Sequence, residues 1–366
     1  PTHPWPRICF QARDANLTKR LEWSVGPSMP PTPDPSETDR IGTETELIQD
    51  YLAPLTNGDP GAFDLRDDAA LLAPAPGQDL VFTSDPIIAG VHFLATENPA
   101  DIAWKALAVN VSDLAAKGAR PISYVLNLAF PESPHRAWMA EFSAGLKAAQ
   151  ESFGCHLIGG DTDVTPGPLS IGVTIIGSLP SGSYVPRQGA RKGDHVFVTG
   201  TIGDAALGLK IRLAQSGFDG LDAEQRDYLV GRYLRPSPRL ALGDTLRAHA
   251  SAALDISDGL LKDLKRLAGP LGVLLSFDRV PLSDAAAAAI ASDPSLFERI
   301  LCGGDDYELL IAVPPALIGL FRRGAASAGV AVTDLGILEE NIPVHVLASD
   351  GTPMDVSLFG YDHFSR

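Results

Sequence analysis

The stretch RDDAALLAPAPGQDLVFTSDPIIAGVHF, residues 66–93, decides how the first half of the chain is expected to fold. Its two apolar runs, Ala69–Leu72 and Leu80–Phe82, are separated by a segment rich in proline and glycine. This pattern is typical of two strands joined by a tight connection. We therefore expect both runs to lie side by side in a sheet.

Two aspartates, Asp68 before the first run and Asp85 after the second, would then meet at one edge of that sheet. Carboxylates about 5 Å apart repel each other by roughly 3 kcal/mol at an effective dielectric constant near 20. The pair would therefore need protons, arginines or a divalent cation. With the hydroxyls of Thr83 and Ser84, these oxygen atoms suit Mg²⁺, which commonly bridges substrate phosphates. The alternative is that the aspartates form turns and the hydroxyls act as caps.

The composition is that of a globular protein, with 45% hydrophobic and 20% charged residues in a chain of 366. This length predicts two domains. The three cysteines (Cys9, Cys155 and Cys302) form neither a disulfide framework nor a zinc motif. No apolar run has the length of a membrane span and no secretory signal is evident, so we expect a reducing cytoplasm. The net charge of −16 disfavours nucleic acid and anionic membranes as partners.

Three segments are expected along the chain. Residues 1–40 are rich in proline, and their basic and acidic residues cancel, which predicts a flexible extension. Residues 41–182 alternate helix and strand patterns and predict an α+β first domain. The polar, glycine-bearing segment 184–193 is a plausible boundary, so residues 183–366 form the expected second domain.

Further aspartates repeat the pattern of the opening stretch, since each of Asp161, Asp255 and Asp258 lies at an expected strand end beside Gly, Ser or Thr. Ser257 would cap the following helix, whose first amides could face a phosphate. Asp113 lies instead on an expected helix that begins after Asn98, where, taken alone, an ion pair with Lys117 on a solvated face explains it better.

A phosphatase interpretation competes for one of these segments. In residues 157–165 an apolar strand precedes Asp161-Thr162-Asp163, which is the nucleophile pattern of haloacid-dehalogenase-like phosphatases. Gly303–Asp306 could serve as the later metal motif of that family. Gly159 and Gly160 interrupt the strand, however, which argues against this interpretation.

A long series of short motifs occurs in order past residue 41, and together they resemble the thiamine-monophosphate kinases, which belong to the superfamily of aminoimidazole ribonucleotide synthetase. The matching segments are Asp67–Leu71, Thr83–Asp85, Gly90–Phe93, Lys105–Ala119, Ile158–Thr162, Gly189–Asp194, Val198–Thr201, Leu234–Arg239, Asp255–Leu260, Gly303–Leu309 and Gly360–Phe364.

The resemblance implies an α+β, two-domain fold like that of aminoimidazole ribonucleotide synthetase. In it, a sheet-based first domain pairs in a homodimer and an α/β-layered second domain completes the active site. It also implies ATP-dependent phosphorylation of thiamine monophosphate to thiamine diphosphate with several Mg²⁺ ions. The transfer would be direct and in line, because nothing in the chain resembles a nucleophile activated by an adjacent base.

The resemblance also implies roles for individual residues. Those that match the metal shell are Asp68, Thr83, Ser84, Asp85, Asp113, Asp161, Asp255 and Asp258, among which Asp113, Asp255 and Asp258 are the expected catalytic residues. Those that match ATP contacts are Gly160, Asp161, Arg187 and Ser257. Those that match the thiamine-phosphate side are His92, Asp305 and Tyr361.

Three residues depart from the family pattern. Arg66 stands where glycine is usual before the paired acids, and Asp163 replaces a usual threonine. Asp305 replaces a usual glutamate, which shortens the side chain and puts its substrate contact in doubt. Two alternatives stay open: a sister ATP-using synthetase of the same superfamily, and an acidic metal-binding protein without turnover.

Overall fold

The computed structural model describes residues 39–348, 351–354 and 360. The expected extension, except for its last two residues, lies outside the described residues, as do Cys9 and the predicted substrate residue Tyr361. From Asp39 onward the chain forms one compact unit. Within the described residues, no helix has both the length and the apolar character needed to cross a membrane.

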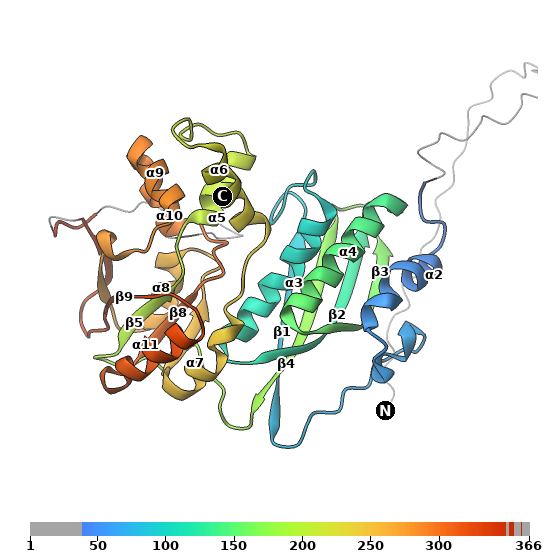
Figure 1. The fold of residues 1–366 in the computed structure, drawn as a ribbon, viewed down its shortest axis with the longest axis horizontal. Helices are drawn as coiled ribbons and strands as arrows, with labels where there is room; N and C mark the ends of the chain where they lie inside the picture. The colour runs from blue at the N-terminus through green and yellow to red at the C-terminus, as the bar shows by residue number, and fades with distance from the viewer. Residues whose placement is uncertain (1–38, 349–350, 355–359, 361–366) are drawn as a thin grey trace, which may run out of the picture. The chain divides into compact units, whose positions relative to one another are not determined.

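The first half is built on a four-stranded sheet with the order β1-β4-β2-β3. Its strands are β1 (Gln78–Ile88), β2 (Arg120–Phe130), β3 (His156–Val164) and β4 (Ser170–Pro180). The central strand β2 is parallel to β3 and antiparallel to β4, and β1 is antiparallel to β4. The long helices α3 (Pro99–Ala116) and α4 (Arg136–Phe153) cover one face of this sheet (Figure 1).

Helix α3 is the central element of this half. It begins where expected, because the Asn98 side chain accepts a hydrogen bond from the amide of Ala100 and Pro99 occupies the first turn. Its side chains are buried on nearly every side, with Leu107 and Leu114 fully enclosed in the core between helices and sheet. A helix that is apolar all round must be covered on all sides, and α3 contacts both halves of the described chain.

The predicted first strand is wrong. Residues 69–72 are irregular, and the amide of Leu71 donates to the carbonyl of Gly61 rather than to a neighbouring strand. Pro74 and Pro76 follow at once and cannot donate to a sheet. The second run is longer than predicted, since β1 extends through Thr83, Ser84 and Asp85 and pairs with β4.

The segment before β1 is helical but changes type along its length. It comprises α2 (Glu44–Leu47), the π-helical η1 (Ile48–Leu52) and the 3₁₀ turns η2 (Ala53–Thr56) and η3 (Pro60–Leu65). The Thr43 side chain accepts a hydrogen bond from the amide of Glu46 and thereby caps the first turn.

The second half holds an antiparallel four-stranded sheet with the order β6-β8-β5-β9 and a parallel two-stranded sheet of β10 and β7. The strands are β5 (His195–Thr199), β6 (Ala252–Asp255), β7 (Val273–Ser276), β8 (Leu309–Val313), β9 (Val332–Ile337) and β10 (Val344–Leu347). The helices are α5 (Asp204–Arg212), α6 (Ala223–Leu234), α7 (Gly243–His249), α8 (Leu260–Ala268), α9 (Asp284–Ser292), α10 (Phe297–Cys302) and α11 (Ile318–Ser327), with short 3₁₀ turns η4 (Leu240–Leu242), η5 (Phe277–Arg279), η6 (Pro294–Leu296) and η7 (Pro315–Leu317).

Helices pack on both faces of this second four-stranded sheet. Phe197 and Phe321 form part of the apolar cluster beneath α7 and α11, whereas Val198 and Leu264 belong to the cluster on the α8 side. The α+β class is therefore confirmed. The division into domains at residues 182 and 183 stays a prediction, and the two four-stranded sheets lie on either side of it in sequence.

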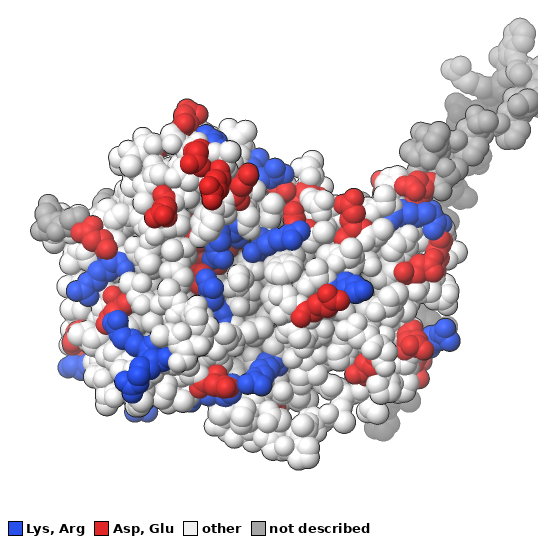
Figure 2. All heavy atoms as spheres, in the orientation of Figure 1, with Lys and Arg blue, Asp and Glu red and all other residues white. Residues whose placement is uncertain are grey.

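Charged side chains are spread over the molecular surface. In Figure 2 acidic and basic groups are interspersed across the visible face, and most basic groups stand next to acidic ones. The excess negative charge is thus not gathered into one patch on this face.

Candidate active site

One face of helix α3 carries the residues around which the site is built. Lys105, Val109, Asp113 and Lys117 recur every four residues, so they lie on one side of the helix. Val109 and Asp113 line one cavity, and Asp113 and Lys117 line another. Asp113 therefore belongs to the wall between the two.

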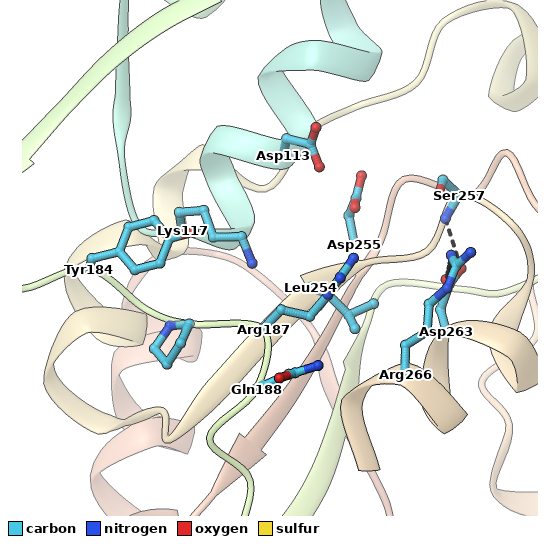
Figure 3. Close-up of a pocket in the computed structure, with 11 residues that line it drawn as sticks. Asp113, Lys117, Tyr184, Arg187, Gln188, Leu254, Asp255, Ser257, Asp263 and Arg266 are labelled. Carbon is cyan, nitrogen blue, oxygen red and sulfur yellow. Dashed lines mark hydrogen bonds and ion pairs between the residues drawn. The ribbon is translucent and has the colours of Figure 1, made fainter. Parts of the chain in front are cut away.

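The first cavity, called here the arginine cavity, has a volume of about 560 Å³. Its charged lining consists of Asp113, Lys117, Arg187, Asp255, Asp263 and Arg266. Figure 3 shows Asp113 and Asp255 facing each other, with Lys117 and Arg187 directed toward the same space. Three basic side chains in one concave site suit an anion with several charges, such as a polyphosphate.

The second cavity, called here the histidine cavity, has a volume of about 460 Å³. Asp85, His92, Asp258 and Asp305 contribute to its lining, and it shares Asp113, Asp255 and Ser257 with the arginine cavity. His92 holds its own loop in place, because its Nδ1 accepts a hydrogen bond of 3.0 Å from the amide of Ile88. The structure thus brings most of the predicted residues to two adjoining cavities.

Three carboxylates meet where the cavities adjoin, and we call Asp85, Asp113 and Asp255 the cavity aspartates. Partial burial and the neighbouring Asp113 raise the pKa of Asp85 to about 6. Burial and the same neighbour raise the pKa of Asp255 to about 8. The hydroxyl of Thr83 donates to Asp113 Oδ2 at 2.6 Å. Positive charge placed among these groups would offset their mutual repulsion.

The donor chemistry of the cavity aspartates fits Mg²⁺. Among residues 39–348, 351–354 and 360, no three Asp, Glu, His or Cys side chains form a metal cage by themselves. Mg²⁺ is usually held by one or two carboxylates, with waters and substrate phosphates completing its octahedron. Two of the cavity aspartates, together with the hydroxyl of Thr83, would meet that requirement.

The turn that carries Ser257 and Asp258 is fixed by Asp263. This carboxylate, 1% exposed, accepts from the amides of Ser257 and Asp258 at 3.1 and 2.9 Å. Arg266 joins Asp263 and Asp258, each at 2.7 Å. Ser257 makes no capping bond to α8, which starts only at Leu260, so that part of the prediction is wrong.

The ion pair expected between Asp113 and Lys117 is absent from the described residues. Lys117 Nζ instead donates to the carbonyl of Ala253 at 2.7 Å, and burial lowers the pKa of this ammonium. Lys117 thereby joins α3 to strand β6, which ends in Asp255.

Asp68 and Asp161 lie away from the cavity aspartates, and we call them the edge aspartates. They line a small cavity of about 110 Å³ with Gly160. Strand β3 bears Asp161 and forms the sheet edge opposite β1, which bears Asp85. Three strand spacings separate these edges, about 14 Å. One chain therefore does not bring all eight predicted metal ligands together.

The open face of the first sheet, which α3 and α4 leave uncovered, also carries predicted residues. The Ser84 hydroxyl lies 2.8 Å from that of Thr174, on the side opposite Thr83. Asp161 pairs with Asn127, next to Leu126 and Leu128, which point into the core, so Asp161 faces the open side. Gly160 is required beside it, because a Cβ there would lie 1.9 Å from the Leu126 carbonyl oxygen.

Asp305 occupies the wall of the histidine cavity, but it already has a partner. Lys105 Nζ lies 2.9 Å from Asp305 Oδ2, and the Tyr307 hydroxyl donates to Oδ1 at 3.3 Å. Sequence reasoning missed Lys105, Asp263 and Arg266. The recurrence of Lys105, Val109 and Asp113 at steps of four residues was the available signal for Lys105, whereas no comparable pattern identifies Asp263 and Arg266.

The phosphatase interpretation is not supported. Asp161 is an exposed residue of an edge strand in a largely antiparallel sheet, whereas that family needs regular βαβ units. Asp306, in the supposed metal motif, is 2% exposed and accepts from the amide of Gly203.

Comparison with known proteins gives consistent results. The family described as AIR synthase related protein, N-terminal domain, matches residues 66–179. The thiamine-monophosphate kinase of Caulobacter vibrioides is 43% identical over 318 residues, which cover 85% of this chain and 89% of that protein.

Solved structures agree. The thiamine-monophosphate kinase of Stenotrophomonas maltophilia K279a has a TM-score of 0.70 and 38% identity, covering 79% of this chain and 90% of that one. AaThiL in complex with AMPPCP and TMP has a TM-score of 0.68 and 32% identity, covering 80% and 89%.

Proposed function

The chain belongs to the thiamine-monophosphate kinase family, and we propose how its residues share the work of that reaction. It catalyses the ATP-dependent phosphorylation of thiamine monophosphate to thiamine diphosphate. The observation that carries our assignment is the pair of adjoining cavities that share Asp113, Asp255 and Ser257. One is rimmed by basic groups, and the other is lined by acids and a histidine.

ATP occupies the arginine cavity in this proposal. Lys117, Arg187 and Arg266 offer positive charge to its phosphates, and the planar guanidinium groups suit paired phosphate oxygens. Thiamine monophosphate occupies the histidine cavity, where acidic groups face its permanently cationic thiazolium ring. The related complex of AaThiL with AMPPCP and TMP supports the presence of both ligands at once.

The chemical step is a direct transfer at the shared wall. A phosphate oxygen of thiamine monophosphate attacks the γ-phosphorus of ATP, the bond to the bridging oxygen breaks, and ADP leaves. The attacking oxygen is already anionic, so no base has to remove a proton. The obstacle is repulsion between two anions, and positioning with charge neutralisation overcomes it.

Mg²⁺ would be held by the cavity aspartates with Thr83 and Asp258. When bound, it supplies positive charge to the phosphate oxygens and screens the two anions from each other. The residues of the chain provide the rest: Asp263 keeps the turn of Ser257 and Asp258 in place, and Asn110 fixes β1 by accepting from the Asp85 amide at 2.8 Å.

A homodimer accounts for the edge aspartates. The open sheet face exposes apolar surface, including Phe82, which is 61% exposed. Pairing this face with that of a second copy would cover it and would bring Asp161 and Ser84 into the interface. Asp68 and Asp161 of one copy would then serve the cavity aspartates of the other.

Formation of thiamine diphosphate is the direct test of activity. Purified protein, Mg²⁺, ATP and thiamine monophosphate are mixed, and the products are separated and identified by mass. A protein that binds Mg²⁺ without producing thiamine diphosphate would overturn the assignment.

Mixed dimers test the shared site. The D113N and D161N variants are expected to be inactive alone. If sites combine residues of two copies, a heterodimer of the two variants contains one intact site out of two. Random reassortment of equal amounts then restores about a quarter of wild-type activity. Mixtures that stay inactive would mean that each chain uses its own Asp113 and Asp161.

A further inference from the structure

Lys105 is a buried cation that takes part in no step of the proposed reaction. Its side chain is 3% exposed, and its ammonium lies 2.9 Å from Asp305 Oδ2 and 3.8 Å from the centroid of the Tyr233 ring. Burying an ammonium is costly unless it is paired. The carboxylate and the aromatic ring provide that pairing.

The loop that presents Asp305 is held in an unusual backbone conformation. Asp305 and Tyr307 have positive φ angles of 63° and 50°, which side chains other than glycine rarely adopt. The amide of Asp305 donates to the Ser257 carbonyl at 3.0 Å, and that of Tyr307 to the Ile256 carbonyl at 2.9 Å. The backbone of this loop is therefore anchored to the segment that carries the metal-side residues.

The side chain of Asp305 is anchored separately. It is 26% exposed and lines the histidine cavity, while Lys105 holds Oδ2 from the buried side. Oδ1 is left beside the Tyr307 hydroxyl, at 3.3 Å. Lys105 thus fixes which carboxylate oxygen is presented and offsets a negative charge that would otherwise add to those of Asp85 and Asp255.

We propose that Lys105 is a specificity-determining, positioning residue for thiamine monophosphate, acting through Asp305. This proposal rests on the assignment of the histidine cavity to that substrate. By pairing with Asp305, Lys105 keeps this carboxylate in the cavity wall as an acceptor for the cationic ring or the aminopyrimidine of the substrate. Because Asp305 is paired with Lys105, it does not compete for the metal ion, which the cavity aspartates would bind.

A second ion pair with one buried partner supplies a control, although here the carboxylate rather than the cation is the buried member. Arg212 forms two hydrogen bonds, of 3.0 and 2.8 Å, with Glu97, whose side chain is 3% exposed. Like Lys105 and Asp305, these residues join the first half of the chain to the second. Neither lines the arginine cavity or the histidine cavity. A pair that serves only to hold the halves together would behave like this one.

The experiment compares K105M and R212M in the full chain. The Michaelis constants for thiamine monophosphate and ATP are measured, and the affinity for thiamine monophosphate is determined calorimetrically with Mg²⁺ and AMPPCP. We expect K105M to raise both the Michaelis and the dissociation constant for thiamine monophosphate at least about 10-fold, as for a lost charge-assisted contact. The constant for ATP should stay within about 2-fold, and R212M should leave all of them within that range.

The double variant K105M/D305N keeps the test decisive if K105M alone does not fold, because it removes both charges of the pair and leaves neither without its partner. If Lys105 acts through Asp305, the double variant is no worse toward thiamine monophosphate than D305N. Losses that multiply would overturn the proposal, as would a K105M variant that binds thiamine monophosphate normally or loses ATP equally. A wild-type protein that forms no thiamine diphosphate would instead refute the proposed function.

Discussion

The cavity aspartates and the edge aspartates carry the same functional group in different surroundings. Asp113 and Asp255 lie partly buried between α3 and β6, close enough to raise the pKa of Asp255, and Thr83 donates to Asp113. Asp68 and Asp161 are exposed on the far side of the first sheet. Close carboxylates with little solvent repel each other unless they are protonated or receive positive charge, whereas exposed carboxylates cost little until another surface covers them. This difference supports the proposed metal site at the cavity aspartates and the proposed contribution of the edge aspartates from a second copy.

The largest expected effect comes from Asp113, which lines both cavities. D113N should lower kcat about 100-fold or more, because the metal ion that this carboxylate would hold contributes several kcal/mol to stabilising the transition state. Steady-state kinetics at saturating Mg²⁺ measure this. D161N should lose activity similarly but, being exposed, should leave the free energy of unfolding in EDTA unchanged. A D113N enzyme of near-normal activity would contradict the proposal that Asp113 holds a catalytic metal ion.

A pH dependence of stability is expected from the cavity aspartates but not from the edge aspartates. The pKa values of Asp85 and Asp255 are raised to about 6 and 8 in the folded chain, above about 3.9 in the unfolded chain. Between the unfolded and the folded pKa of each group, the folded chain therefore binds more protons than the unfolded chain. The free energy of unfolding consequently falls as the pH rises. The stabilisation that these raised pKa values provide is fully present below about pH 4. It is lost as the pH rises through about 6 for Asp85 and about 8 for Asp255.

Urea unfolding in EDTA at pH 5 and pH 8.5 tests this pH dependence. We expect the free energy of unfolding to be lower at the higher pH and Mg²⁺ to restore part of it. D255N should flatten the dependence, whereas D161N should leave it as in the wild type. If the free energy of unfolding changes equally with pH in D255N and in the wild type, the raised pKa described for Asp255 is wrong.

A smaller effect is expected from Asp263, which supports the cavity side without lining the histidine cavity. D263N removes a charged acceptor from the amides of Ser257 and Asp258, a contact worth about 1.5–3 kcal/mol. We expect kcat/KM to fall roughly 10–150-fold, with a higher Mg²⁺ concentration needed for half-maximal activity. D284N, an exposed substitution in the first turn of α9, is the control and should be neutral. Equal Mg²⁺ dependence in D263N and the wild type would contradict a positioning role.

The sequence contained local signals for some parts of this arrangement and none for others. Helix α3 could be predicted because Asn98 and Pro99 start it and Leu107, Val111 and Leu114 share one face. The hairpin prediction failed because β1 pairs with β4, about ninety residues later, rather than with its neighbour. Short apolar runs do not reveal distant partners, and the prolines at 74 and 76 argue against a strand in residues 69–72.

The same limit applies to the site. The recurrence of aspartates beside small residues pointed to the acids themselves, and the family resemblance supplied their roles. The resemblance did not show which aspartates lie at which edge of the sheet, because their placement depends on the strand order. The contact of Lys105 with Asp305 joins residues two hundred positions apart. Only packing brings such residues together, so sequence spacing carries no trace of it.

The smallest expected effect concerns Asp163, which shares the open face with Asp161. Its carboxylate is exposed, and the hydrogen bond described for it is to the amide of the next residue, Val164, at 2.7 Å. D163T should therefore keep kcat/KM within about 2-fold and change stability by no more than about 0.5 kcal/mol, with a slight gain because threonine favours strands. Kinetics, urea unfolding and sedimentation would be measured beside D161N. If D163T shifts the Mg²⁺ dependence as D161N does, Asp163 belongs with the edge aspartates and that group extends along β3. If it weakens self-association instead, the open face is an interface in which this carboxylate has a partner, and the contribution of the edge aspartates is set by how that interface closes.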